Sequence, residues 1–217
     1  MKSKPLPVAS DVVISSAGRE WLKWLALVLM TGDHANKVLN LGMPILGDIS
    51  RVVFPIFAIV LAYNMREVSP ASRRQSMVRL LCAAVIAQPF HVLCFGDPLT
   101  LNVLFTLLLG VFVVYSGTPM LSLVAVLTAG WFVDYGPMGV AVVVTASMLF
   151  HGGLHVRLLL ALAASVALLY LVNGNWYALA ALPLLAVLGR VPGAFPRWRW
   201  TFLAYYVGHL ALLAAIA

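Results

Sequence analysis

Charged side chains are scarce in this sequence of 217 residues, and acidic ones are the scarcest. Only 10% of the residues are charged, with 7 Asp or Glu against 14 Lys or Arg, whereas a soluble globular domain has about 25%. Hydrophobic residues make up 63% of the chain, and its mean hydropathy is +1.00. A water-soluble fold of this size cannot cover so much apolar surface, which excludes a soluble enzyme, a disordered chain and a secreted disulfide scaffold. The composition predicts an integral membrane protein, and its long unbroken apolar runs favour helices over a transmembrane barrel.

Cysteine and the common catalytic motifs are also nearly absent. The two cysteines, Cys82 and Cys94, fall in one apolar run, where helical geometry separates them by about 18 Å, too far for a disulfide. The sequence has no Walker loop, GxSxG elbow or HExxH motif. His151 and His155 have the i, i+4 spacing of metal ligands but no third ligand beside them, so no metal is expected.

Apolar segments fill the chain after a short polar lead-in. A perpendicular span needs about 20 residues, so the shorter segments are expected to be tilted, and the fifth and sixth are either tilted spans or two arms of a re-entrant element. The expected fold class is an all-α, polytopic integral membrane helix bundle, with a cytoplasmic N-terminal segment at 1–18 and one transmembrane domain at 19–217. The nine segments are expected at 21–40, 49–65, 77–95, 99–115, 119–133, 137–150, 156–173, 175–189 and 199–216.

The distribution of Lys and Arg predicts the orientation of this bundle. With nine spans and a cytoplasmic N-terminus, twelve of the fourteen cations fall on the cytoplasmic side, as the positive-inside rule requires. The net charge of +7 therefore reflects topology rather than a nucleic-acid partner. The twelve are Lys2, Lys4, Arg19, Lys23, Arg66, Arg73, Arg74, Arg79, Arg157, Arg190, Arg197 and Arg199. Lys37 and Arg51 are the two left over, which makes them functional candidates.

Ionisable side chains inside apolar segments are costly and usually face a cavity or a partner, so they mark function. In the first segment Asp33, His34 and Lys37 fall within an arc of about 100° on one helix face. The alternative is a structural Asp33–Lys37 ion pair with a hydrogen-bonded histidine. Arg51 opens the second segment, where it either holds a phosphate or carboxylate or pairs with Asp48 or Asp33.

Three further pairs of polar residues interrupt apolar surroundings. Asn102 and Thr106 in the fourth segment share a helix face, although hydrogen bonding between helices is an alternative explanation for Thr106. Asp134 and Tyr135 lie in the turn between the fifth and sixth segments. Tyr205 and His209 in the last segment are spaced i, i+4.

The order of these runs resembles that of the TraX family, membrane proteins that N-acetylate conjugative pilin, and the similarity covers about residues 20–216. The family is in turn distantly similar to multispanning membrane acyltransferases. The sequence departs from the family pattern at Ser50, where glycine is more usual, and at Val207-Gly208, where a Tyr-Pro pair is expected. The matching runs are Leu22-Lys23, Met30, Asp33-His34, Arg51 with Phe54-Pro55-Ile56-Phe57, Arg79-Leu80, Ala87-Gln88-Pro89, Leu101-Asn102-Val103-Leu104-Phe105-Thr106-Leu107, Asp134-Tyr135-Gly136 with Gly139, and His209-Leu210.

The resemblance implies an acyltransferase of the bacterial inner membrane that acetylates the N-terminus of a conjugative pilin, with acetyl-CoA as acyl donor. The pilin and the lipid bilayer are the partners expected. The implied roles are a general base at His34, a carboxylate at Asp33 that fixes its tautomer, a second catalytic histidine at His209, oxyanion donors at Asn102, Tyr135 or Tyr205, a clamp for phosphate or carboxylate at Arg51 and Lys37, and further substrate contacts at Asp134 and Thr106.

Three other functions stay open at this point. The protein could mature pilin by another reaction, such as cyclisation or a different acyl transfer. It could be a non-catalytic assembly factor of the conjugation apparatus, which would tolerate loss of His34. A secondary transporter would use the same buried Asp, His and Arg, but its usual sign, two repeats with matched broken helices, is not found in the sequence.

Overall fold

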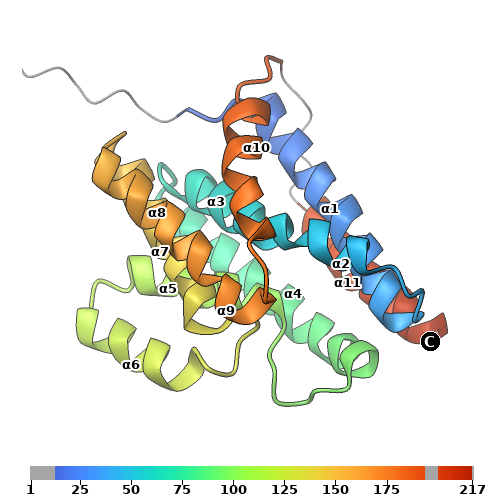
Figure 1. Cartoon of the computed structure of the whole chain (residues 1–217). Helices are drawn as coiled ribbons and strands as arrows, with labels where there is room; N and C mark the ends of the chain where they lie inside the picture. The colour runs from blue at the N-terminus through green and yellow to red at the C-terminus, as the bar shows by residue number, and fades with distance from the viewer. Residues whose placement is uncertain (1–12, 194–199, 217) are drawn as a thin grey trace, which may run out of the picture.

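The chain folds into a bundle of helices. The computed structural model describes residues 13–193 and 200–216, and all the regular structure in those ranges is helical apart from one isolated parallel bridge between Leu101 and Val133. The elements are α1 (Ser16–Val38), α2 (Pro44–Ile49), the 3-10 turn η1 (Ser50–Val52), α3 (Val53–Met65), α4 (Pro70–Phe95), α5 (Val103–Tyr115), α6 (Pro119–Ala129), α7 (Gly136–Gly152), α8 (Val156–Leu168), α9 (Tyr170–Asn173), the 3-10 turn η2 (Tyr177–Ala180), α10 (Ala181–Leu188) and α11 (Thr201–Ile216) (Figure 1).

The expected class, an all-helical membrane bundle, is confirmed, and each predicted segment contains a helix. Among the described residues, three continuous helical stretches are long and apolar enough to cross a membrane: Pro44–Met65, Pro70–Phe95 and Val156–Asn173. Five more apolar helices have 10–17 residues. The number of spans and the side of the N-terminus stay predictions. Lys2, Lys4, Arg197 and Arg199, which carry part of the charge argument, lie outside the described residues.

Several helices begin earlier than the apolar runs suggested, because capping residues rather than hydropathy fix their first turns. α4 starts at Pro70, seven residues before the expected 77, and the Ser69 side chain accepts a hydrogen bond from the Ser72 amide. A serine cap followed by proline at the first helical position is a strong start signal. Pro44 likewise starts α2. The charged residues Arg73 and Arg74 that delayed the predicted start lie within the first turns of α4.

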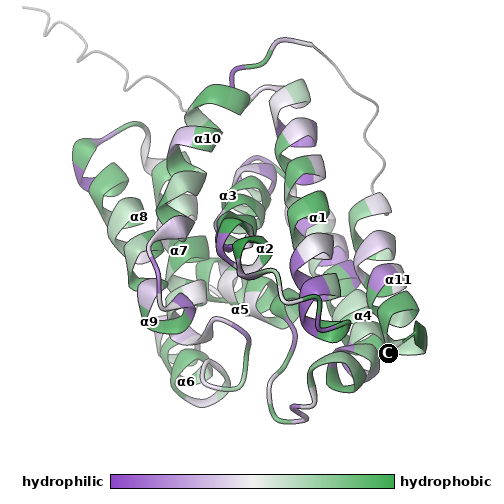
Figure 2. Ribbon diagram, turned by 45° about the vertical axis from the view of Figure 1, so that its right-hand side comes forward, coloured by the Kyte–Doolittle hydropathy of each residue, from purple (hydrophilic) through white to green (hydrophobic). Residues whose placement is uncertain are grey.

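α3 occupies the centre of the bundle. Eleven of its thirteen residues are buried, whereas α6 buries only Ser122. α7 packs against α3, α5 and α8, and α11 packs along α4. Figure 1 shows α1 running beside α11. The ribbon in Figure 2 is mostly hydrophobic in colour, and hydrophilic residues gather in the lower part of α1, near α4 and α11.

Close packing of α7 depends on two glycines. A Cβ on Gly110 would lie 2.5 Å from Cβ of Val143. A Cβ on Gly139 would lie 2.8 Å from Cγ2 of Thr106 and 3.0 Å from Cζ of Phe54. Real Cβ atoms do not approach this closely, so glycine at these positions lets α5 and α3 lie directly against α7. This packing fixes the turn that precedes α7, which forms one wall of the site described next.

Candidate functional site

A cavity of about 270 Å³ lies between α1, α3, α4, α5 and α11. Its apolar lining includes Met30, Phe54 and Phe57. It reaches the surface beside the exposed residues Lys37 and Asp97. The polar side chains that line it are Asp33, His34, Lys37, Ser50, His91, Asp97, Thr100, Asp134, Tyr135 and Tyr206. Five residues singled out from the sequence, Asp33, His34, Lys37, Asp134 and Tyr135, therefore line one cavity.

Two histidines from opposite ends of the chain form a hydrogen bond at this site. Nδ1 of His34 on α1 lies 2.8 Å from Nε2 of His209 on α11, and the two rings are nearly parallel, with 16° between their planes. Nδ1 of His209 lies 3.0 Å from the carbonyl oxygen of Tyr205. A carbonyl only accepts, so Nδ1 of His209 carries a proton and donates it. In the neutral pair, Nε2 of His209 then accepts from Nδ1 of His34.

This chain of hydrogen bonds fixes the tautomer of His34. With Nδ1 protonated and engaged, Nε2 of a neutral His34 keeps a free lone pair, which is the state that a general base needs. His34 also contacts the edge of Phe95 on α4, with 5.2 Å between ring centroids. α11 continues as a regular helix through Gly208, so the departure from the family pattern at Val207-Gly208 leaves His209 in register with Tyr205.

Asp33 does not make the contact expected of it, which is a correction to the predicted triad. Its Oδ2 accepts from Nζ of Lys37 at 2.7 Å, and Oδ1 is buried without a hydrogen-bond partner. Successive helical residues point about 100° apart, so an Asp that pairs with the residue four positions later points away from the histidine next to it. The structural Asp33–Lys37 ion pair that was left open as an alternative is present, and His209 holds His34 instead.

Tyr205 is committed to helix packing. Its hydroxyl lies 2.7 Å from the hydroxyl of Thr31 on α1, and its ring stacks beside that of His209. The bond ties α11 to α1 one turn away from the histidine pair. Tyr205 therefore positions His209 through its carbonyl, while the neighbouring Tyr206 is the tyrosine of α11 that lines the cavity.

Asn102 and Thr106 also hold the site rather than line it. Asn102 is fully buried. Its side-chain oxygen caps α5 by accepting from the Leu104 amide, and its side-chain nitrogen donates to Gln88 on α4 at 2.8 Å. The hydroxyl of Thr106 donates to the carbonyl oxygen of Asp134. Neither residue lines the cavity, and their polar atoms are used in hydrogen bonds between elements. Asn102 has no donor left for an oxyanion, since both of its amide hydrogens are engaged, by Gln88 and by the Ala84 carbonyl.

The turn before α7 brings Asp134 and Tyr135 to the cavity wall. Leu101 pairs with the turn through two backbone hydrogen bonds. The Leu101 amide donates to the Phe132 carbonyl, and the Asp134 amide donates to the Leu101 carbonyl. Tyr135 adopts a positive φ of 62°, which is uncommon for a bulky residue and costs free energy. Its ring stacks on Phe54, with 4.2 Å between centroids. The packing thus holds a strained backbone that presents both side chains to the cavity.

Arg51 lies in η1, within electrostatic reach of Asp134 and Tyr135. Its Nε is buried without a hydrogen-bond partner in the described part of the chain. Asp48, one of the two partners considered for it, accepts instead from Asn175 at 2.9 Å. A buried guanidinium nitrogen with unused donor capacity, next to a polar cavity, is available to a ligand.

Three titratable residues of the site were missed in the sequence. His91 on α4 is buried, lines the cavity, and its Nδ1 has no hydrogen-bond partner in the described ranges. It satisfies the same criterion that singled out His34, an ionisable residue within an apolar segment. Tyr206 carried no signal of its own beside Tyr205. Asp97 is hidden in a loop whose Gly, Asp and Pro residues read as an ordinary turn.

Asp97 adds a negative charge at the mouth of the cavity, where the ammonium of Lys37 is already paired with Asp33. Hydrogen bonds from the Thr100 hydroxyl and the Leu99 amide hold the pKa of this carboxyl below its usual range. The group therefore stays ionised at neutral pH and attracts a cation approaching from solvent. No set of three or more His, Cys, Asp or Glu residues gathers in metal-binding geometry within residues 13–193 and 200–216.

Known proteins share sequence similarity with this chain. A protein of Rickettsia prowazekii (strain Madrid E) that carries no functional description is 26% identical over 153 residues, which cover 64% of this chain and 59% of that protein. The match thus spans about three fifths of that relative's length. No solved structure matches the chain. The sequence model of the TraX protein family matches residues 18–217, a stretch that includes all the residues of the cavity, and this chain therefore belongs to the TraX family.

Proposed function

We propose that this protein is a membrane-embedded acyltransferase that acetylates the N-terminal amine of a conjugative pilin, with acetyl-CoA as the acyl donor. Membership of the TraX family suggests a conjugation-related pilin-processing protein. The observation that carries the finer proposal is the hydrogen bond between His34, which lines a polar cavity within an apolar bundle, and His209 behind it. A multi-pass arrangement in the bacterial inner membrane follows from the same proposal.

The residues of the cavity supply what acyl transfer to an amine requires. The neutral amine nitrogen attacks the thioester carbonyl carbon, a C–N bond forms, the C–S bond breaks with CoA leaving as a thiolate, and the nitrogen loses a proton that passes through His34 to that thiolate. Nε2 of His34 takes that proton, and the bond to His209 keeps the imidazole in the accepting tautomer. Tyr135, Tyr206 and His91 line the same cavity and are candidate hydrogen-bond donors to the oxyanion.

The size of the cavity limits what it can hold. Pockets for drug-sized ligands measure about 300–1,000 Å³, and this one is about 270 Å³. It accommodates a small acyl group and a terminal amine, while the nucleotide part of an acyl-CoA stays outside it. Lys37 lines the cavity and Arg51 lies within electrostatic reach of Asp134 and Tyr135 in its wall, so the two cations suit a carbonyl or carboxylate of the acceptor better than a distant phosphate.

The charges at the cavity favour a cationic acceptor. Asp97 at the mouth and Asp134 in the wall have carboxyl groups, Oδ1 of Asp33 is buried with no partner, and the ammonium of Lys37 at the mouth is already paired with Oδ2 of Asp33. A chain terminus that carries an ammonium group is attracted to such a mouth and can donate to the unsatisfied oxygen inside. The pilin N-terminus reaches this mouth either from the outer surface or laterally within the bilayer.

The proposal is tested by the intact mass of pilin from cells that carry the wild-type protein, no protein, or single variants. His34→Ala is expected to lower the rate of acetylation by about 10²–10⁴-fold, the usual cost of losing a general base. His151→Ala is the matched control. Its Nδ1 bonds the Ser147 carbonyl on α7, away from the cavity, so pilin is expected to be fully acetylated.

Variant levels in the membrane are measured in parallel by immunoblotting, so that a folding defect is recognised. Fully acetylated pilin in His34→Ala cells, in a time-resolved assay at normal protein level, would contradict catalysis by His34 and favour a non-catalytic assembly role. A mass change other than that of an acetyl group would support an enzyme that modifies pilin but contradict acetylation as its reaction.

A further inference from the structure

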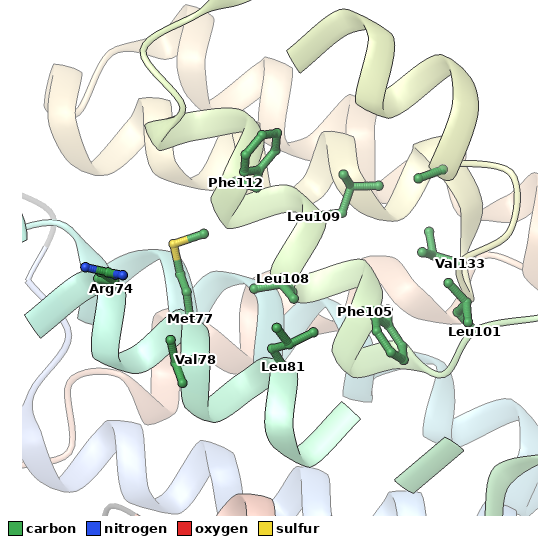
Figure 3. Close-up of a pocket in the computed structure, with 11 residues that line it drawn as sticks. Arg74, Met77, Val78, Leu81, Leu101, Phe105, Leu108, Leu109, Phe112 and Val133 are labelled. Atoms are coloured by element: carbon green, nitrogen blue, oxygen red, sulfur yellow. The ribbon is translucent and has the colours of Figure 1, made fainter. Parts of the chain in front are cut away.

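A second cavity, larger than the first, lies on the outside of the bundle and takes no part in the proposed chemistry. It is a groove of about 440 Å³ between α4 and α5, closed at one end by the turn before α7 (Figure 3). Arg74 to Leu81 on α4 and Phe105 to Phe112 on α5 form its sides, and Leu101 and Val133 form its far end. We call it the α4–α5 groove.

The bridge between Leu101 and Val133 separates the groove from the candidate site. Side chains of successive extended residues point to opposite faces. Leu101 and Val133 line the groove, while their neighbours Thr100 and Asp134 line the catalytic cavity. The groove therefore lies back to back with the site and is not an entrance to it.

The lining of the groove selects among possible occupants. Apart from Arg74 every lining side chain is apolar, so the amide groups of a pantetheine arm would be buried without partners, at a large cost. Transmembrane helices pack closely where small residues let the backbones approach, but Leu, Met, Val and Phe dominate here and Ala129 is the single small residue. A flexible hydrocarbon chain has no polar groups to leave unpaired and does not need small residues in order to pack.

The length of the groove fits one leaflet of a bilayer. From Val103, where α5 begins, to Phe112 the helix advances about 14 Å at the helical rise, and Leu101 lies just before it. The hydrocarbon core of a bilayer is about 30 Å thick, so one leaflet contributes about 15 Å. A membrane-spanning helix would need about twice that length, whereas a single acyl chain fills it.

Arg74 marks the end of the groove where a headgroup would lie. It is exposed, and the structure gives it no partner among the described residues. Its neighbours are engaged: Arg73 lies over the ring of Tyr115 at 3.7 Å, and Nε of Arg79 donates to the Gln75 carbonyl. A free guanidinium at one end of an apolar channel matches a phosphate attached to a hydrocarbon chain.

We propose that the α4–α5 groove binds one acyl chain of an anionic phospholipid, whose phosphate is held by Arg74. The bound chain packs against Leu101 and Val133 from the side opposite to the site. It thereby supports the bridge that positions Asp134 and Tyr135. The proposal is independent of the reaction that the site performs.

The test is native mass spectrometry of the purified full chain in detergent, with equal amounts of dipalmitoyl phosphatidylglycerol and dipalmitoyl phosphatidylcholine. Wild-type protein is expected to retain one phosphatidylglycerol in preference to phosphatidylcholine. Arg74→Ala is expected to reduce that preference roughly tenfold, as loss of a charge-assisted hydrogen bond does. Arg157→Ala removes another exposed arginine outside the groove and is expected to keep the wild-type preference.

Leu81→Trp tests the groove itself. Leu81 is 43% exposed, so a larger side chain there fills the groove without entering the core. Retention of both lipids is expected to fall in this variant, and an unchanged melting temperature shows that the fold is intact. Wild-type lipid retention in Leu81→Trp, an unchanged preference in Arg74→Ala, or cross-linking of a pilin helix to Leu81 would each overturn the proposal.

Discussion

The His34–His209 bond joins residues 175 positions apart, and it decides which nitrogen of His34 is free. In a serine-protease triad a carboxylate performs this service. Here a second imidazole does so, itself held by a backbone carbonyl, and the nearby carboxylate of Asp33 is paired with Lys37. Under the proposed function His209 is a positioning residue, because it would act on the substrate through His34.

Two substitutions of His209 distinguish positioning from simple packing. His209→Leu removes the acceptor and is expected to lower the acetylation rate, by as much as about 10⁴-fold, the loss seen when a triad carboxylate is replaced. His209→Gln can place an amide oxygen near the position of Nε2 and is expected to recover much of the activity. The measurement is the rate of pilin acetylation at matched protein level. Equal activity in the two variants would show that the hydrogen bond does not matter.

Arg51 offers a second test with single residues. Lysine keeps the charge but loses the planar fork of the guanidinium, whose Nε is buried and unpartnered. Arg51→Lys is expected to lower pilin acetylation roughly tenfold or more, as loss of a charge-assisted hydrogen bond would. Arg157→Lys, at an exposed position, is the control. Acetylation near the wild-type rate would reduce Arg51 to a residue that starts a helix.

At the level of elements, the site depends on how closely α7 approaches α3 and α5. The strained turn at Tyr135 is held from three directions: by the bridge to Leu101, by Thr106 on the carbonyl of Asp134, and by the ring of Phe54. Each of these contacts requires α7 to begin close to its neighbours. Gly139, one turn into α7, is the residue that permits this approach.

Gly139→Ala is expected to destabilise the protein. The new Cβ would lie 2.8 Å from Cβ of Tyr135 and from Cγ2 of Thr106, and overpacking of this kind costs about 1–3 kcal/mol. Gly208→Ala on α11 is the control, because no atom lies within 4 Å of the added carbon. It is expected to be neutral or to stabilise by about 0.5–1 kcal/mol through helix propensity. Thermal unfolding in detergent measures both, and equal melting temperatures would contradict the packing argument.

For the whole molecule, the short helices need explanation. α5 has 13 residues and α6 has 11, so they extend about 20 Å and 17 Å, well under the roughly 30 Å of a bilayer core. The loop between α4 and α5 folds back toward α4, since Thr100 and Asn102 both bond Gln88 rather than the end of that helix. The site therefore lies beside the last turns of α4 rather than beyond its end, and apolar helices surround it.

The orientation of the whole chain can be tested with two reporters. A tag inserted after Glu67, between α3 and α4, is expected on the cytoplasmic side, and a tag fused after Ala217 on the opposite side. Both positions avoid interrupting a helix of the described structure. Accessibility to a membrane-impermeant label gives the answer. Labelling of both tags from the same side would contradict the nine-span arrangement.

Composition and local pattern are enough to predict the helical membrane class. In a bilayer the backbone polar groups of every apolar run must be hydrogen-bonded internally, and a helix forms all of these bonds within its own segment. The same reasoning found His34, Lys37, Asp134 and Arg51, since an ionisable residue among apolar neighbours is conspicuous wherever the chain takes it. Helix starts such as Ser69-Pro70 are also encoded locally, although hydropathy alone placed that helix too late.

Only the tertiary structure decided which of these residues are partners. The rotation and depth of α11 against α1 bring His209 to His34 and leave Asp33 to Lys37. The crossing of α4 and α5 turns Asn102 into a helix cap and draws His91 into the cavity. A hydrogen bond requires atoms to meet within a few tenths of an ångström. Helices far apart in the sequence reach that precision only through packing of the whole bundle.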